Sequence, residues 1–272
     1  AGAAAVTIDT TAAPAQTIFG STTITNGNNL TNAVSLVGTT GGLQLRGNVT
    51  VKNGSATTSN GITVTDLTDS GTTSSSFTNG SSPANTIAFT GALRNTFLGV
   101  VSATNGASTG ANVINATRLS STKGLNLTNG SATTSNDVAV GGAGVTDLVS
   151  VTGNLVIANG ASADTDVDIN NLTTLGANAV GNVTMTNAAT GVGGTTVTLG
   201  ATAANSISGN LQITNQTSTG TRSVVMKQTT VSGRTGVNIY EIGAGDTSLT
   251  VGNVSLVTIT NGLVIQDGTG SA

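Results

Sequence analysis

Apolar and polar residues alternate in short runs along the whole chain, and many of these runs end at asparagine. The clearest run is Val49-Thr50-Val51-Lys52-Asn53, in which the two valines would share one face of a strand. Similar runs end at positions 26, 53, 79, 105, 129, 159, 187, 215, 241 and 261. The pattern predicts short β-strands that recur about every 26 residues.

A longer identity supports this period. Residues 53–60 and 129–136 both read NGSATTSN, and they lie about three periods apart. Each period holds about three strand candidates, as in 33–37, 43–45 and 49–51, separated by Gly, Asn, Ser and Thr. An antiparallel hairpin sandwich is the alternative, but its turns should recur every 8–12 residues or so. The sequence therefore predicts an all-β fold, a parallel β-solenoid of about ten coils with about three short strands per coil.

Stacked coils would bring the asparagines at the strand ends into one column, about 4.8 Å apart. Asn side chains in such a column can hydrogen-bond along the axis. Asn and Gly also tolerate a left-handed backbone, which a corner could use. The alternative is that these asparagines are turn residues without a ladder. The sequence predicts a structural ladder of Asn26, Asn53, Asn79, Asn105, Asn129, Asn159, Asn187, Asn215 and Asn261.

Composition excludes several kinds of chemistry. Charged residues are 7% and aromatic residues 2% of the chain, and it contains no Cys, His or Trp. Catalytic triads built on histidine and zinc sites built on Cys or His are therefore excluded. The net charge of −3 comes without a basic stripe, and no apolar run approaches the length of a membrane helix. We expect no enzymatic activity, no cofactor, no nucleic-acid partner and no membrane insertion.

One irregular segment, residues 77–97, holds Phe77, Phe89 and Phe97, three of the four phenylalanines. A locally wider core with stacked rings is the plainer interpretation, and an aromatic ligand patch is the alternative. A second segment carries Asp164, Asp166 and Asp168, which would point to one side of a strand. These are weak candidates for a calcium site, and a solvated acidic edge is the alternative.

A third segment, 222–246, is unusually rich in charge for this chain. It holds three basic residues, the single tyrosine and the single glutamate. We interpret it either as a contact patch or as a local cluster of salt bridges. The candidate residues are Arg222, Lys227, Arg234, Tyr240 and Glu241.

Runs that begin with Gly-Asn carry a resemblance to known proteins. They occur at 47–51, 153–157, 181–185 and 209–213. These runs resemble the repeats of bacterial surface β-solenoids, such as autotransporter passengers and filamentous-haemagglutinin-like adhesins. The resemblance implies a secreted protein. The chain departs from autotransporters because it lacks a C-terminal translocator barrel, which favours a stand-alone subunit.

The two ends of the sequence predict how such a solenoid would be used. Residues 1–21 are a strand-like segment and a candidate inter-subunit contact, residues 22–262 the solenoid, and residues 263–272 a last strand and tail. Neither end contains an amphipathic helix or a charged cap, and open strand edges recruit other chains. We therefore expect an extracellular structural protein that assembles head to tail with copies of itself.

Two other functions fit the same pattern. One is an adhesin or surface stalk that binds a glycan or a host surface. The other is an ice-binding solenoid, although Lys52, Ala158 and Gln212 interrupt its outward threonines. The small residues at 1–5 resemble the product of signal-peptide cleavage, and an arbitrary boundary is the alternative. The expected location is extracellular or on the cell surface.

Overall fold

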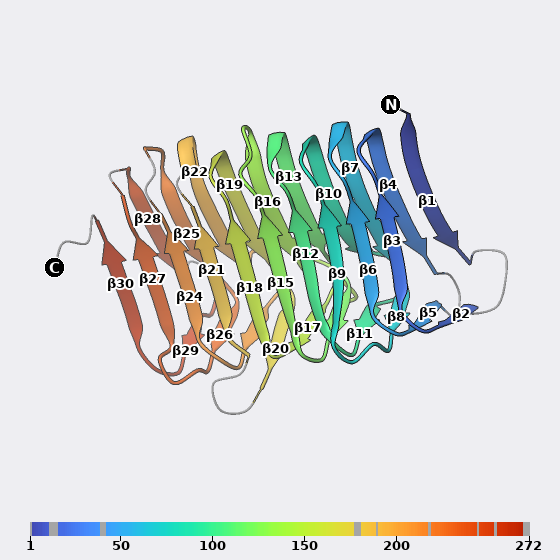
Figure 1. Cartoon of the computed structure of the whole chain (residues 1–272). Helices are drawn as coiled ribbons and strands as arrows, with labels where there is room; N and C mark the ends of the chain where they lie inside the picture. Colours follow the sequence, from blue (N-terminus) through green and yellow to red (C-terminus); the bar gives the residue numbers. More distant parts are fainter. Residues whose placement is uncertain are drawn as a thin grey trace.

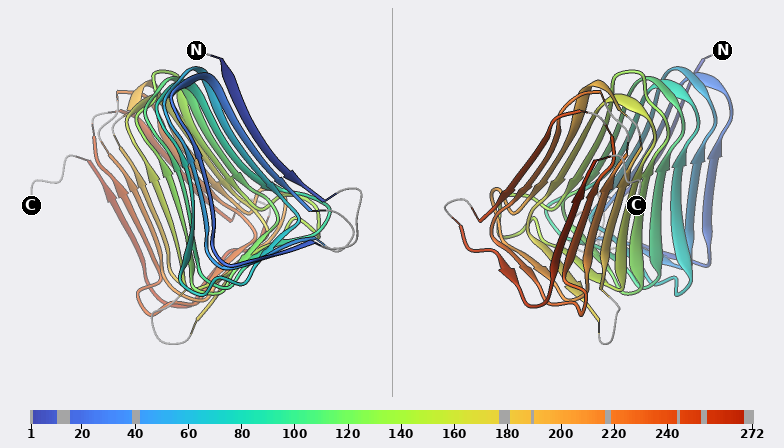
Figure 2. Two further views of the ribbon diagram at one scale, coloured as in Figure 1. Left: turned by 45° about the vertical axis from the view of Figure 1, so that its right-hand side comes forward. Right: turned by 90° about the vertical axis from the view of Figure 1, so that its left-hand side faces the viewer.

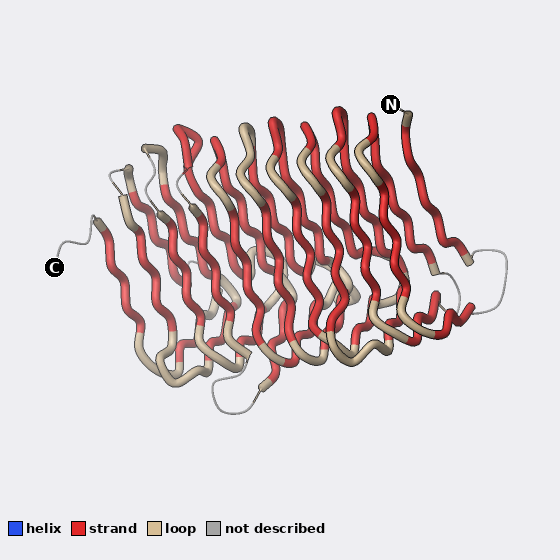
Figure 3. The backbone as a smooth tube through the Cα atoms, viewed as in Figure 1, coloured by secondary structure: helices blue, strands red, loops and turns tan. Residues whose placement is uncertain are grey.

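A computed structural model confirms the predicted parallel β-solenoid. Its described residues form β-strands joined by loops, with the strands lying side by side in a long stack (Figure 1, Figure 3). Among these residues there is no helix long and apolar enough to cross a membrane. The structure describes residues 2–10, 16–38, 42–176, 181–188, 190–216, 219–243, 245–252 and 255–268.

The strands form three parallel ten-stranded sheets, and each coil contributes one strand to each sheet. Sheet 1 contains β1 (Ala3–Asp9), β4 (Asn29–Val37), β7 (Ala56–Thr65), β10 (Ser82–Thr90), β13 (Ser108–Ala116), β16 (Ser135–Val140), β19 (Ser162–Ile169), β22 (Thr190–Leu199), β25 (Arg222–Met226) and β28 (Thr247–Val251). Sheet 2 contains β2 (Gln16–Phe19), β5 (Leu43–Arg46), β8 (Leu67–Asp69), β11 (Asn95–Phe97), β14 (Leu119–Ser121), β17 (Val149–Thr152), β20 (Leu172–Leu175), β23 (Asn205–Ile207), β26 (Thr229–Val231) and β29 (Thr258–Ile259). Sheet 3 contains β3 (Thr22–Asn26), β6 (Val49–Asn53), β9 (Ser74–Asn79), β12 (Val100–Asn105), β15 (Gly124–Asn129), β18 (Asn154–Asn159), β21 (Val183–Asn187), β24 (Leu211–Asn215), β27 (Val237–Glu241) and β30 (Leu263–Asp267).

The three sheets enclose a narrow core that runs along the axis (Figure 2). In β6, for example, Val49 and Val51 point inward and are fully buried, whereas Thr50 and Lys52 point outward and are exposed. Equivalent positions of successive coils pair directly, as Val51 does with Ile24 and Phe77. The alternation read from the sequence therefore sets which side chains fill the core.

The predicted boundaries at 21/22 and 262/263 do not coincide with a change of structure. On the N-terminal side, β1 and β2 pair with β4 and β5 in the same sheets as the following coils. At the other end β30 pairs with β27. The described residues between Ala3 and Asp267 therefore belong to one solenoid.

The glycines that follow the ladder asparagines serve close packing rather than a left-handed turn. Gly80, Gly106 and Gly130 are absent from the residues with positive φ. A Cβ atom at Gly80 would lie 2.6 Å from the backbone carbon of Gly54 in the coil before it. The expectation of a left-handed backbone at these glycines is thus wrong. Glycine is needed there because the backbone of the neighbouring coil leaves no room for a side chain.

Candidate functional site

The corner between sheet 3 and sheet 1 carries the predicted asparagine ladder. The Nδ2 atom of each asparagine donates to the Oδ1 atom of the next along the axis, beginning with Asn26 and Asn53. Seven such bonds of 2.7–3.1 Å follow one another. The members are Asn26, Asn53, Asn79, Asn105, Asn129, Asn159, Asn187 and Asn215, all of which are buried.

A second ladder, which the sequence analysis missed, lies on the sheet 1 side of the same corner. Four bonds of 2.9–3.2 Å join its fully or almost fully buried asparagines. Its members are Asn32, Asn60, Asn85, Asn112 and Asn136. A signal for it was present, because the repeated octet NGSATTSN both begins and ends with asparagine. Its first asparagine lies in one ladder and its last in the other.

Backbone carbonyls fix the orientation of the amides. Besides its ladder bond, Nδ2 of Asn105 donates to the carbonyl of Val113 at 3.0 Å, and Nδ2 of Asn79 donates to that of Thr86 at 3.0 Å. Asn53 and Asn129 make the same kind of second bond. A flipped amide would turn its oxygen toward both a carbonyl and a neighbouring amide oxygen. The ladder therefore has a direction, with every donor pointing toward the C-terminal end.

The ladder changes chemistry near its C-terminal end. Nδ2 of Asn215 donates to Oε1 of Glu241 at 2.8 Å, so a carboxylate takes the place of the next amide. Arg222 occupies the corresponding position of the second column, in register with Thr195 and Thr247. Its Nε atom lies 3.2 Å from Oε2 of Glu241, and both side chains are at most 2% exposed. A buried ion pair thus closes the two asparagine columns.

Two residues of the predicted contact patch, Arg222 and Glu241, form this buried ion pair. Arg222 and Glu241 are buried in the coil, so their assignment to a contact surface is wrong, and the salt-bridge alternative holds for them. Lys227 and Tyr240 are partly exposed and Arg234 is exposed, and their role in contacts stays a prediction. The alternation held a signal for this, because Arg222 shares the parity of the inward Val224 and Glu241 that of the inward Ile239, but their charge led us to expect an exposed position.

The prediction of Asn261 as a ladder member is also wrong. Its Nδ2 atom donates to the carbonyl of Gly233, and the ladder position after Glu241 belongs to Asp267. Asn261 lies in the loop before β30. The spacing of 20 residues between positions 241 and 261 therefore came from assigning the last ladder position to the wrong residue. The true step, from 241 to 267, is 26 residues and keeps the period.

Burial raises the pKa of Glu241 from 4.5 to about 7, although the hydrogen bond from Asn215 and the charge of Arg222 oppose the shift. The nearby carboxylate of Asp267 raises it further. Since the folded protein keeps this proton to a higher pH than the unfolded chain, its contribution to stability is complete below about pH 4.5 and is lost as the pH rises through about 7.

We therefore expect the free energy of unfolding to fall by about 2–3 kcal/mol across this range because of Glu241 alone. Urea denaturation at several pH values, followed by circular dichroism, measures this dependence. Glu241→Gln should flatten the curve between the two pH limits. Parallel curves for the variant and the natural chain would contradict the prediction.

The three candidate calcium ligands do not form a metal site in the structure. Asp164, Asp166 and Asp168 lie on the outer face of β19, with Asp137 of β16 beside Asp166. Burial and the neighbouring carboxylates raise the pKa of Asp166. Among the described residues, no group of three or more His, Cys, Asp or Glu side chains is arranged to hold a metal ion. The described geometry thus fits an acidic face.

The phenylalanines of segment 77–97 form part of the core. Phe77 of β9, Phe89 of β10 and Phe97 of β11 are fully buried and pack edge to face, with ring centroids 5.1–6.1 Å apart. Each comes from a different sheet, so the cluster joins all three. The interpretation as stacked core rings is confirmed, and these rings are not accessible to a ligand.

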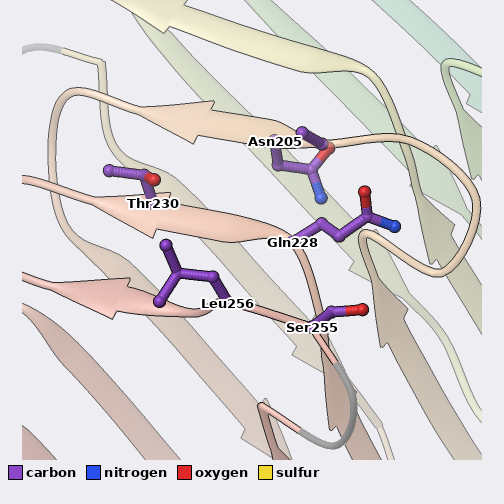
Figure 4. A pocket seen from close by; sticks show the side chains of 6 residues that line it. Asn205, Gln228, Thr230, Ser255 and Leu256 are labelled. Carbon is purple, nitrogen blue, oxygen red and sulfur yellow. The ribbon is translucent and has the colours of Figure 1, made fainter.

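A shallow pocket lies on sheet 2 near the C-terminal end (Figure 4). Asn205, Gln228, Thr230, Ser255 and Leu256 line it, together with Ala204. Nδ2 of Asn205 already donates to the carbonyl of Ile169, and Oδ1 of Asn205 accepts from the amide of Leu172. Nε2 of Gln228 donates to the carbonyl of Gly200. The amide of Asn205 and Nε2 of Gln228 are therefore already engaged in bonds within the protein.

An outward column of nine hydroxyl side chains and one amide, that of Gln44, follows sheet 2. Pairing places these side chains in direct register, one per coil, about 4.8 Å apart. This regularity favours the ice-binding alternative, which stays a prediction that thermal hysteresis would measure. The column consists of Thr17, Gln44, Thr68, Thr96, Ser120, Ser150, Thr173, Ser206, Thr230 and Thr258.

The ends of the solenoid expose both strand edges and core residues. At the N-terminal end, β1, β2 and β3 each have one neighbouring strand, and at the C-terminal end the same holds for β28, β29 and β30. Ile18 is 36% exposed, and Ile265 is 47% exposed although it lies in register with the buried Ile239. Such edges and apolar side chains are templates for further strands.

Comparison with known proteins adds no relative. No protein-family model, curated protein or solved structure matches this chain significantly.

Proposed function

We propose that the protein is an extracellular structural subunit, which assembles head to tail through the two ends of its solenoid. The observation that supports this is the match between the ends. When the stack continues in the same register, β30 lies along β3, and both have five residues. Ile265 then meets Ile24 of the next copy, just as Ile265 meets Ile239 within the chain.

The other two sheets continue equally well. Following the register of sheet 1 places Leu249 of β28 over Val6 of β1, and Val251 over Ile8. In sheet 2, Ile259 falls over Ile18. Inward apolar positions thus meet inward apolar positions in every sheet, while the strand edges gain hydrogen-bond partners. A contact between two different ends of one molecule repeats without closing, which produces a filament.

Two neighbouring residues of β30 provide a matched test of this junction. Ile265 points inward and is 47% exposed, whereas Val264 points outward and is 48% exposed. Ile265→Lys places a charge inside the junction and should abolish filaments, because an unpaired buried charge is strongly unfavourable. Val264→Lys places the same charge on the outer surface and should leave them intact.

Negative-stain microscopy and sedimentation velocity, over a wide range of concentrations and at mildly acidic and neutral pH, measure the outcome. Discrete monomers of the natural chain under all these conditions would overturn the proposal. Equal loss of filaments in both lysine variants would show that the assembly does not use this register.

A further inference from the structure

The direction of the first ladder gives its two ends unequal chemistry. Every Nδ2 donor points toward the C-terminal end, so Asn26, the first member, has its Nδ2 bonded to Asn53 and presents Oδ1, an acceptor, toward the N-terminal end. At the other end, the position that follows Glu241 is Asp267. An ionised carboxylate is also purely an acceptor. Both ends of the ladder thus require a donor.

Head-to-tail stacking would bring these two acceptors together. Continuing the register of sheet 3 places Asp267 of one copy directly over Asn26 of the next, since both occupy the ladder position. Within the chain each ladder contact from Asn26 to Glu241 joins a donor to an acceptor, and Arg222 lies beside both acids where Glu241 is followed by Asp267. At the junction, an ionised Asp267 would lose water and face an amide oxygen, without a hydrogen between them.

We propose that protonation of Asp267 gates head-to-tail assembly, because its carboxylic acid can donate to Oδ1 of Asn26 in the next copy whereas its carboxylate cannot. This inference rests on the proposed function and specifies how the junction is controlled. In the protonated state a donor faces an acceptor across the junction. In the ionised state one buried acceptor on each side is left without a donor, which weakens the contact.

The amides cannot solve the mismatch by reversing. From Asn53 to Asn129 each Nδ2 in the ladder also donates to a backbone carbonyl, as Asn105 does to Val113, and a reversed amide would lose both bonds. Reversal would also turn the oxygen of Asn215 toward Glu241, which now accepts from its Nδ2 atom. The backbone carbonyls and Glu241 therefore favour the same direction of the ladder.

The groups around Asp267 do not supply the missing donor. Nη2 of Arg222 on β25 lies 3.7 Å from Oδ1 of Asp267, but Arg222 is shared with Glu241 of β27, which is the other acid beside it. Oγ1 of Thr247 on β28 donates to the same Oδ1 atom at 3.0 Å. In the facing copy, the nearest positions of β1 and β3 in this register, Ala4 and Asn26, carry no charge.

The isolated chain keeps Asp267 in contact with water. Its side chain is 57% exposed, so the carboxylate is solvated before docking. The cost of the mismatch therefore arises when a second copy covers the end. This places the effect on association rather than on folding of the monomer.

Asp267→Asn tests the gate directly, because an amide donates at any pH. The critical concentration for polymerisation is measured by sedimentation between about pH 4, where aspartic acids ordinarily protonate, and about pH 8. For the natural chain we expect it to be roughly tenfold to a hundredfold higher at the upper pH. In Asp267→Asn it should stay low throughout.

Asp246→Asn is the matched control. Asp246 is exposed beside β28 at the same end of the solenoid, so this variant removes an equal charge without touching the ladder. It should keep the pH dependence of the natural chain. If both variants lower the critical concentration at neutral pH equally, general charge repulsion explains the effect and the gate is overturned.

Other outcomes separate the gate from the filament itself. Filaments of the natural chain that form equally well at both pH values, with no gain in Asp267→Asn, would overturn the gate and leave head-to-tail assembly standing. If neither the natural chain nor Asp267→Asn polymerises at any pH, the proposed function fails and the gate fails with it.

Discussion

Asn105→Asp is expected to lower the free energy of unfolding by about 4 kcal/mol at neutral pH and by far less near pH 4. The Asn105 side chain is 1% exposed, accepts from Asn79 and donates to both Asn129 and Val113. An ionised aspartate could still accept but would face two oxygens without a hydrogen. Keeping the acid protonated at pH 7 instead costs about 1.4 kcal/mol for each pH unit above its ordinary pKa.

The pH dependence separates the direction of the ladder from simple packing. Asn105→Ala removes the donor and the acceptor together, so it should destabilise the fold without a new pH dependence. Thr104→Ala, at the outward neighbouring position, should change stability by about 0.5 kcal/mol or less. Urea denaturation from about pH 4 to about pH 8 compares the three variants. Equal loss for the Asp variant at both pH limits would contradict a directional ladder.

The first ladder was predictable because it repeats at a strand end where the alternation is clear. In Val49-Thr50-Val51-Lys52-Asn53 the asparagine shares the parity of the inward valines, so its burial follows from the same rule. Once the coils stack, burial and identity together require hydrogen bonds between neighbouring asparagines.

The second ladder was harder to infer because no such pattern leads into it. Asn60 begins the inward alternation of β7 rather than ending it, and the residues before it are partly exposed. Its column also changes identity along the axis, from asparagine to Thr165, Thr195 and Arg222. The repeated octet was the available signal, and it marks the corner that both ladders share.

The register at the C-terminal end shows a limit of pattern reading. Val257-Thr258-Ile259-Thr260-Asn261 has the form of a ladder strand, yet its central residues belong to β29 in sheet 2. The true ladder strand, β30, ends at Asp267. The pairing of strands fixes this register, because the five residues of β30 pair with the five residues of β27. The sequence alone does not show which strands pair.

Acids take the place of asparagine at the last two positions of the first ladder, one inside the solenoid and one at its C-terminal end. Glu241 and Asp267 stand where two more asparagines would have extended the column, and Arg222 lies 3.2 Å from Glu241 and 3.7 Å from Asp267. The first ladder thus ends in charged side chains rather than amides. We infer that these acids make the C-terminal end of the solenoid chemically different from its interior. A ladder with an amide at every position would have the same chemistry at its end as in its interior.

The core offers the second large effect, because the three phenylalanines occupy one level of a narrow interior. The residues that follow them in the next coil are small, since Phe77 pairs with Ala103, Phe89 with Ala116 and Phe97 with Ser121. The level of the rings is thus followed by a level of small side chains. Neither alanine nor serine can move into a space that a ring vacates.

Phe89→Ala is therefore expected to lower the free energy of unfolding by about 3–5 kcal/mol, near the upper end of the range for such truncations. Phe89 is fully buried, and its ring centroid lies 5.1 Å from that of Phe77 and 6.1 Å from that of Phe97. Phe19→Ala is the control, because Phe19 is 76% exposed, and it should cost about 1 kcal/mol or less. Urea denaturation followed by circular dichroism measures both variants. A loss for Phe89→Ala no larger than that for Phe19→Ala would show that the ring cluster is not what holds the three sheets together.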